Sequence, residues 1–113
     1  MAEVIGLVGP CTSGKSTIRP LLEAEGYPVR HIAQEHSFVP DMWQVVSNPD
    51  RLVFLDVSYE ESLRRRKTDW TPADYEEQQR RLGHARDHAD LVIMTDGQSP
   101  EAIATQILDF LKA

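Results

Sequence analysis

Short runs of apolar residues alternate along the chain with stretches in which apolar residues recur at helical spacing. The continuous runs are rich in β-branched and aliphatic residues, and they predict buried strands. They cover residues 3–8, 29–33, 51–57 and 90–95. The periodic stretches predict amphipathic helices with one apolar face. They cover residues 13–25, 60–67, 71–89 and 100–111.

Capping residues and one proline bear on the helix boundaries. Thr71 is a predicted N-cap, with Pro72 at the first helical position and Asp74 three residues after the cap. Ser99 caps the last predicted helix in the same way. Pro20 lies inside the first predicted helix, where it removes a backbone donor and should bend or shorten the helix.

The alternation of strands and helices predicts the fold class. It is typical of an α/β domain with a parallel sheet, and right-handed crossovers place helices on both faces. We expect a single domain over residues 1–113 with a short sheet of about four strands. Residues 38–46 have no clear period, and a short helix after Pro40 is favoured there. Ligands of such sheets bind beyond the carboxyl ends of the strands.

Composition narrows the classes of partner. The chain has 113 residues, of which 41% are hydrophobic, and no apolar run approaches the length of a membrane span. The net charge of −6 argues against nucleic acid or a membrane surface as a partner, because both require a positive footprint. A single cysteine, Cys11, and an N-terminus without a basic leader lead us to expect a cytoplasmic protein. A domain with so small a core is expected as a monomer or a homodimer.

The turn after the first predicted strand fits the phosphate-loop motif G-x-x-x-x-G-K-[ST]. Its residues, with the threonine that follows, are Gly9, Pro10, Cys11, Thr12, Ser13, Gly14, Lys15, Ser16 and Thr17. Such a loop turns backbone N–H groups and a helix N-terminus toward phosphate oxygens. Lys15 would reach the terminal phosphates, and the Ser16 hydroxyl would bind Mg²⁺. The motif therefore predicts ATP or ADP together with Mg²⁺ as ligands.

Three segments together resemble P-loop kinases of the nucleoside-monophosphate, shikimate and adenylate kinase group. They cover roughly half of the chain and read GPCTSGKST, LVFLDVSYEESLRRR and ADLVIMTDGQSPEAIATQILDFL. The resemblance implies a three-layer P-loop NTPase fold. It also implies transfer of the γ-phosphoryl group from Mg–ATP to a small metabolite or nucleotide.

The second and third segments suggest where the base would lie. The resemblance implies that Arg65, with Arg64 as its neighbour, packs on the adenine ring, and that the loop holding Gly97, Gln98 and Pro100 lies against the base. The alternative for the arginines is a solvated basic helix end that complements the helix dipole. The alternative for the loop is a plain turn and helix cap.

Later arginines resemble those that clamp the transferring phosphates in these kinases. Arg81 is the candidate for a catalytic role, and Arg65 is also expected to have one. Arg80 occupies a position similar to that of Arg81, and Arg86 is a further candidate. Phosphoryl transfer depends on positioning and on neutralising oxygen charge, which explains the need for such a clamp. The alternative is a polar helix face on which Arg80 and Arg81 pair with Glu76 and Glu77.

An acidic residue is expected to assist the metal or to orient the nucleophile. Glu35, just after the second predicted strand, is favoured, because shikimate-type kinases have acidic residues there. Asp56 ends an apolar run and is the alternative metal ligand. His36 is a candidate general base or acceptor contact, or else a plain surface histidine.

One departure from the resembling kinases leaves the acceptor unknown. Residues 26–50 are too few for the acceptor-binding insertion that these kinases carry at this place. A minimal kinase is the first hypothesis. The second is a nucleotide-binding module or slow ATPase without an acceptor, and the third is a scaffold that has lost the activity.

Overall fold

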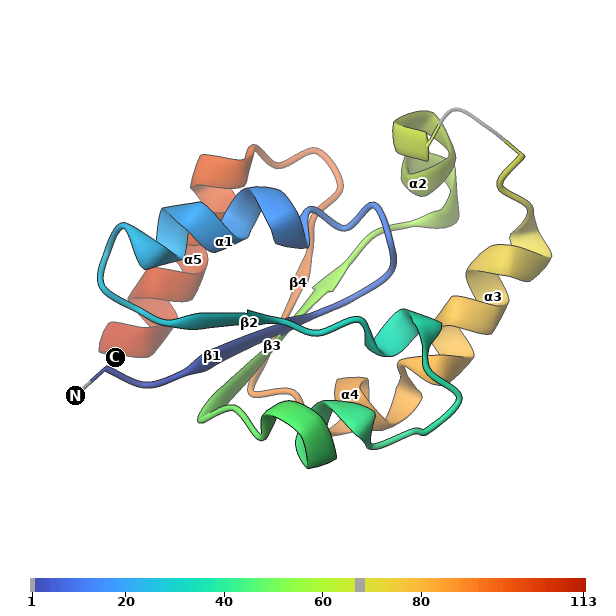
Figure 1. Cartoon of the computed structure of the whole chain (residues 1–113). Coiled ribbons are helices and arrows are strands. Elements are labelled where there is room, and N and C mark those ends of the chain that lie inside the picture. Colours follow the sequence, from blue (N-terminus) through green and yellow to red (C-terminus); the bar gives the residue numbers. More distant parts are fainter. Residues whose placement is uncertain (1, 67–68) are drawn as a thin grey trace.

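The computed structural model describes residues 2–66 and 69–113, in which strands and helices alternate (Figure 1). The strands are β1 (Ile5–Val8), β2 (Val29–His31), β3 (Arg51–Asp56) and β4 (Leu91–Met94). The α-helices are α1 (Lys15–Glu23), α2 (Tyr59–Arg66), α3 (Pro72–Arg81), α4 (Gly83–His88) and α5 (Pro100–Lys112). Between β2 and β3 lie a 3-10 turn, η1 (Gln34–His36), and a π-helical turn, η2 (Trp43–Ser47).

The strands form one all-parallel sheet in the order β2-β1-β3-β4. Ile5 of β1 lies opposite Val29 of β2 on one side and opposite Arg51 of β3 on the other. The carboxyl ends of the strands therefore share one edge, and α2 and α3 project beyond it (Figure 1). The predicted α/β class and parallel sheet are confirmed.

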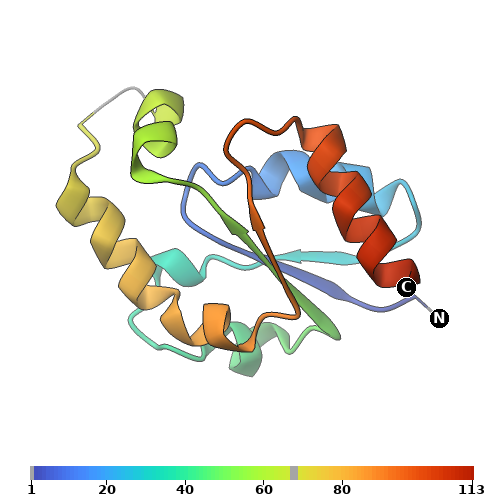
Figure 2. The same ribbon diagram turned by 180° about the vertical axis from the view of Figure 1, so that it is seen from behind.

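Two apolar clusters cover the two faces of the sheet. Leu55 of β3 packs in the first cluster with Ile18 of α1 and Ile107 of α5. Phe54, the preceding residue, packs in the second cluster with Leu82. Successive side chains of a strand point to opposite faces, so β3 contributes to both clusters. Figure 2 shows α1 and α5 together on one side and α4 on the other.

The predicted single helix over 71–89 is wrong, because the structure divides it into α3 and α4. The division falls at Leu82, whose N–H bonds to the carbonyls of both Gln78 and Gln79. Leu82 is fully buried against the sheet, whereas α3 leans outward toward the turn after β1 (Figure 1). Gly83 is a weak helix former, so interrupting the helix next to it costs little free energy.

The helix starts and strand ends also differ in detail from prediction. The first helix begins at Lys15, not at residue 13, and it continues to Glu23 in spite of Pro20. The short helix expected after Pro40 is the π-helical turn η2. Every predicted strand is present but one or two residues shorter. The predicted helix 60–67 is α2, and residue 67 lies outside the described ranges.

The capping box predicted at Thr71 is confirmed. The Asp74 N–H donates to Thr71 Oγ1 at 3.1 Å, and the Thr71 N–H donates to Asp74 Oδ2 at 3.1 Å.

Within the described part of the chain, each helix is too short or too polar to cross a bilayer.

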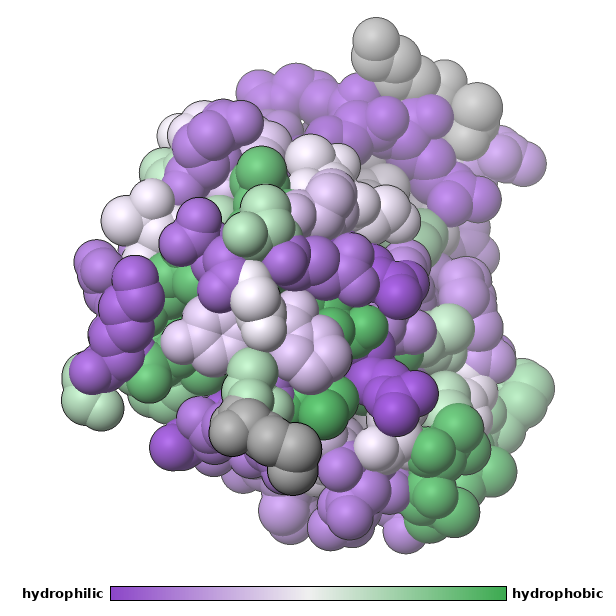
Figure 3. Space-filling view, turned by 60° about the vertical axis from the view of Figure 1, so that its left-hand side comes forward, coloured by the Kyte–Doolittle hydropathy of each residue, from purple (hydrophilic) through white to green (hydrophobic). Residues whose placement is uncertain are grey.

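Hydrophilic side chains cover much of the face in Figure 3, and hydrophobic side chains gather at its lower right. The exposed large hydrophobic residues between β2 and β3 are Phe38, Val39, Val45 and Val46.

Candidate functional site

The predicted phosphate loop joins β1 to α1 at the carboxyl edge of the sheet. Gly9 and Gly14 both have positive φ angles, of 153° and 97°. A Cβ atom on Gly9 would lie 2.0 Å from the carbonyl oxygen of Leu55, so only glycine fits there. Thr12 also has a positive φ of 123°, which is unusual for a residue with a branched side chain. The loop is thus held in a conformation that ordinary turns avoid.

Lys15 and Glu35 meet in the interior next to this loop. Lys15 Nζ lies 2.5 Å from Glu35 Oε2 and 2.5 Å from the carbonyl oxygen of Gly9. Both side chains are only 4% exposed. Burial lowers the pKa of Lys15 below its ordinary value, and the charge of Glu35 offsets part of that effect. β2 lies beside β1, and this places Glu35, twenty residues along the chain, next to the lysine.

A pocket of about 590 Å³, here called the loop pocket, opens over this pair. Its lining is Cys11, Thr12, Gly14, Lys15, Ser16, Thr17, His31, Ala33, Glu35 and His36. His36 Nε2 lies 3.8 Å from Glu35 Oε2. Burial lowers the pKa of His31, and the charge of Lys15 lowers it further.

The loop pocket has oxygen donors suited to Mg²⁺. Glu35 Oε1 is buried and has no hydrogen-bond partner among the described residues, and the exposed Ser16 lines the same pocket. Within residues 2–66 and 69–113, no group of three or more His, Cys, Asp or Glu side chains could hold a metal ion by itself. Mg²⁺ needs no such cage, because it keeps waters and shares its coordination with phosphate oxygens. Glu35 and Ser16 therefore fit this ion.

A second pocket of about 410 Å³, here called the side pocket, adjoins the loop and shares Thr12, Gly14 and Thr17 with the loop pocket. Its lining is Thr12, Ser13, Gly14, Thr17, Ile18, Glu61, Arg65, Gln98, Pro100 and Ile103. It combines an apolar wall with a guanidinium group. Gly97 shapes the adjoining turn with a φ of 71° but is not part of the lining.

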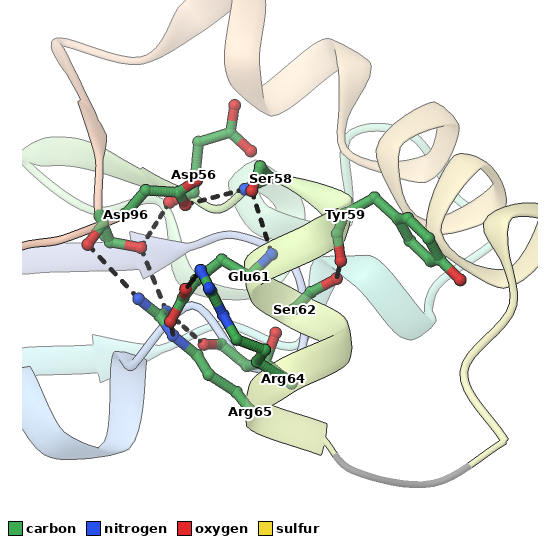
Figure 4. A network of polar contacts seen from close by, with 10 residues as sticks. Asp56, Ser58, Tyr59, Glu61, Ser62, Arg64, Arg65 and Asp96 are labelled. Carbon is green, nitrogen blue, oxygen red and sulfur yellow. Dashed lines mark hydrogen bonds and ion pairs between the residues drawn. The ribbon is translucent and has the colours of Figure 1, made fainter.

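Arg65 is fixed in place by contacts from three directions (Figure 4). Its Nη1 donates to the Thr12 carbonyl oxygen at 2.8 Å and to Thr95 Oγ1 at 3.2 Å. Its Nε donates to Glu61 Oε2 at 3.0 Å. Arg64 instead pairs with the other oxygen of Glu61, and its side chain is 75% exposed. The two neighbours thus differ: Arg65 lines the side pocket and Arg64 faces solvent.

Asp56 has protein partners for both carboxylate oxygens. Its Oδ2 pairs with Arg86, and its Oδ1 accepts from Gln79 at 3.0 Å and from the Val57 N–H at 2.9 Å. Asp56 and Arg86 line neither the loop pocket nor the side pocket. The guanidinium carbon of Arg86 also lies 4.4 Å from the Phe54 ring centroid. These contacts tie α4 and α3 to the end of β3.

The two adjacent arginines of α3 lie in different surroundings. Arg80 is exposed and pairs with Glu77, not with the predicted Glu76. Arg81 Nη1 lies 3.4 Å from the Glu35 carbonyl oxygen, and the Arg81 guanidinium carbon lies 4.1 Å from the Phe38 ring centroid. The predicted pairing of Arg81 with Glu77 is present at 3.4 Å. Arg81 is thus the arginine of α3 that lies beside the loop pocket.

Sequence reasoning missed two side chains that reach the loop. Gln78 Oε1 accepts from the Cys11 N–H at 3.0 Å, and Gln78 Nε2 lies 3.4 Å from Cys11 Sγ. Arg66 Nη1 lies 3.2 Å from the same sulfur. Gln78 is 67 residues from Cys11 along the chain, and a single glutamine in a polar helix gives no sequence signal. Only the packing of α3 against the loop reveals it.

Comparisons with known proteins supply no family for this chain. A scan against models of known protein families matched none, and a search of curated proteins found no significant match. The function of this chain is therefore inferred from the geometry of the loop pocket and the side pocket.

Proposed function

We propose that this chain is a small P-loop kinase of the three-layer NTPase type, which binds Mg–ATP and transfers the γ-phosphoryl group to a small acceptor. The observation that carries the proposal is the convergence of Lys15, Ser16 and Glu35 on the loop pocket, behind a glycine-shaped loop. Backbone strain and buried unpaired polar atoms concentrate where a ligand would complete the structure.

The loop and α1 would hold the phosphates. The first turn of α1 leaves backbone N–H groups without intrahelical partners, and the helix dipole adds positive charge there. Lys15, the first residue of α1, brings a full positive charge to the same place. Together they compensate the charge of a di- or triphosphate within a chain whose net charge is −6.

The side pocket would hold the base. Arg65 offers the flat face of its guanidinium group, and such groups stack on aromatic rings. Pro100 and Ile103 supply apolar surface to the lining of this pocket. The volume of about 410 Å³ is within the range of small-molecule sites.

The loop pocket would be the place of reaction. Mg²⁺ would neutralise charge on the transferring group, and Ser16 and Glu35 are the residues that would hold it. Lys15 would stabilise negative charge on the phosphate oxygens. Arg81, beside Glu35, would do the same from the opposite side on a small movement of α3. His36 would contact the acceptor at the mouth of the pocket.

A nucleotide-binding module or slow ATPase remains the second candidate, because of how residues 26–50 are used. This interval supplies β2, η1 and η2, and Trp43 of η2 is buried in the sheet cluster around Phe54. Residues 26–50, all of them described, thus supply one strand, two short turns and part of the loop pocket, and they form no separate acceptor-binding unit.

Thermal shift tests the proposal. ATP, ADP and GTP, each with and without Mg²⁺, should raise the melting temperature by mass action if they bind the folded state. Lys15→Ala should abolish the shift, because it removes the buried positive charge. The absence of any shift at millimolar nucleotide would favour a scaffold.

Transfer of labelled γ-phosphate separates the two candidates. A kinase should move the label to a member of a panel of small hydroxylated and phosphorylated metabolites. Release of free phosphate alone, unaffected by every panel member, would favour the slow ATPase.

A further inference from the structure

The ion pair of Lys15 with Glu35 is the most deeply buried one among the described residues. It commits the lysine ammonium to two protein oxygens, Glu35 Oε2 and the carbonyl of Gly9, each at 2.5 Å. An ammonium group has three donors, so two of the three are engaged within the protein. One donor is left for a phosphate, and a phosphate that draws the ammonium group fully to itself must compete with Glu35 for Lys15.

That competition is unfavourable for a nucleotide that arrives without metal. Drawing Lys15 away would leave the Glu35 carboxylate buried and without a countercharge, which strongly disfavours the product state. Its second oxygen, Oε1, already has no hydrogen bond within the described part of the chain. The phosphate would also place further negative charge beside this carboxylate.

A divalent cation would supply the missing countercharge to the Glu35 carboxylate. A hard cation takes carboxylate oxygens as ligands, and Glu35 lines the same pocket as Ser16. We infer that Glu35 acts as a metal-dependent latch on Lys15: it holds the lysine until a divalent cation takes the carboxylate and frees Lys15 for the phosphates. This inference rests on the proposed function, and it names the regulation of that site.

Calorimetric titration with ATP at pH 8 tests the latch. Wild type should bind ATP with Mg²⁺ about tenfold or more tightly than ATP with EDTA, within the usual range of coupling between sites. Glu35→Gln frees Lys15 without adding a charge. It should therefore bind metal-free ATP about threefold or more tightly than wild type does, and its gain from Mg²⁺ should fall to about threefold or less.

Glu25→Gln is the matched control. It removes the same charge from an exposed position in the turn that follows α1, so it should keep the Mg²⁺ dependence of wild type. An unchanged Mg²⁺ dependence in Glu35→Gln, or weaker binding of metal-free ATP, would overturn the latch and leave the proposed function standing. No binding of ATP by wild type under either condition would overturn both.

A second variant keeps the inference testable if Glu35→Gln does not fold. Lys15→Met releases the carboxylate from its partner, so Mn²⁺ alone, followed by electron paramagnetic resonance, should bind about fivefold or more tightly than to wild type. Equal Mn²⁺ affinity in the two proteins would contradict the latch.

Discussion

Buried polar atoms without partners gather around the loop after β1. Among the described residues, the atoms without a hydrogen bond are Thr12 Oγ1, Ser13 Oγ, Glu35 Oε1 and Arg81 Nε. Arg81 Nε does lie 3.4 Å from Glu77 Oε2 as an ion pair. Buried side-chain polar atoms in folded proteins usually have a partner, and each exception calls for a reason. Here the four belong to the loop, to the acid beside it and to the arginine next to that acid. A bound polyphosphate with its metal ion would give partners to atoms in this group.

Arg65 and Arg64 provide a comparison at the residue scale. Arg65→Ala removes the guanidinium face of the side pocket and should weaken ATP binding about tenfold, from the loss of ~1–2 kcal/mol of stacking. Tripolyphosphate, which has no base, should bind Arg65→Ala almost as well as wild type. Fluorescence competition against a labelled ATP analogue measures both.

Arg64→Ala is the control for that prediction, because Arg64 is its exposed neighbour. An equal loss of ATP affinity in Arg64→Ala would contradict the distinction between the two arginines. So would a parallel loss of tripolyphosphate binding in Arg65→Ala.

For single helices and strands, the sequence predicts the boundaries correctly where contacts between neighbouring residues determine them. The capping box at Thr71 and the strand before Gly9 were both predictable from neighbouring residues. The division of the helix over 71–89 was not, because it depends on what Leu82 and Gln78 contact far away in the chain. Helix propensity at Gly83 allows the change of direction but does not require it.

Substitution of two glycines tests whether the loop after β1 packs closely against β3. Gly9→Ala places a methyl group 2.0 Å from the Leu55 carbonyl, so we expect a loss of roughly 2–4 kcal/mol in the free energy of unfolding. Gly83→Ala meets no atom within 4 Å and lies at the start of α4. It should be neutral or stabilise by about 0.5–1 kcal/mol.

Urea unfolding of both variants measures the effect. A Gly9→Ala protein as stable as Gly83→Ala would show that the close approach of the loop to β3 is not as described.

At the scale of the whole molecule, parallel strand order brings distant residues together. The expectation that functional groups follow the strands led to Lys15 and Glu35, which the neighbouring strands β1 and β2 place side by side. The contacts of Gln78 and Arg66 with Cys11 could not be predicted. They depend on how α2 and α3 lean over the edge of the sheet, and periodicity carries no information on that.

Acid titration tests the packing of the loop after β4 against α2. Hydrogen bonds from Arg64 and Arg65 lower the pKa of Glu61. Burial acts to raise the pKa of Asp96, but hydrogen bonds from Ser58 and the charge of Arg65 outweigh it, so the net change is downward. Both groups then add stability above their unfolded pKa values, near pH 4, and that stability is lost as pH falls through their lower folded values.

Asp96→Asn keeps an oxygen that can accept from the Ser58 N–H but does not titrate. Its free energy of unfolding should therefore fall less than that of wild type between pH 5 and pH 2. Circular dichroism in urea measures this difference, and identical slopes would contradict a lowered pKa for Asp96.

Binding of a nucleoside polyphosphate by the loop after β1 underlies every role proposed for the site. Its most direct test is isothermal titration of the purified, folded wild-type chain with ATP and with ADP in the presence of Mg²⁺. We expect a saturable heat of binding with one site per chain. A folded protein that gives no heat of binding with either nucleotide would contradict it.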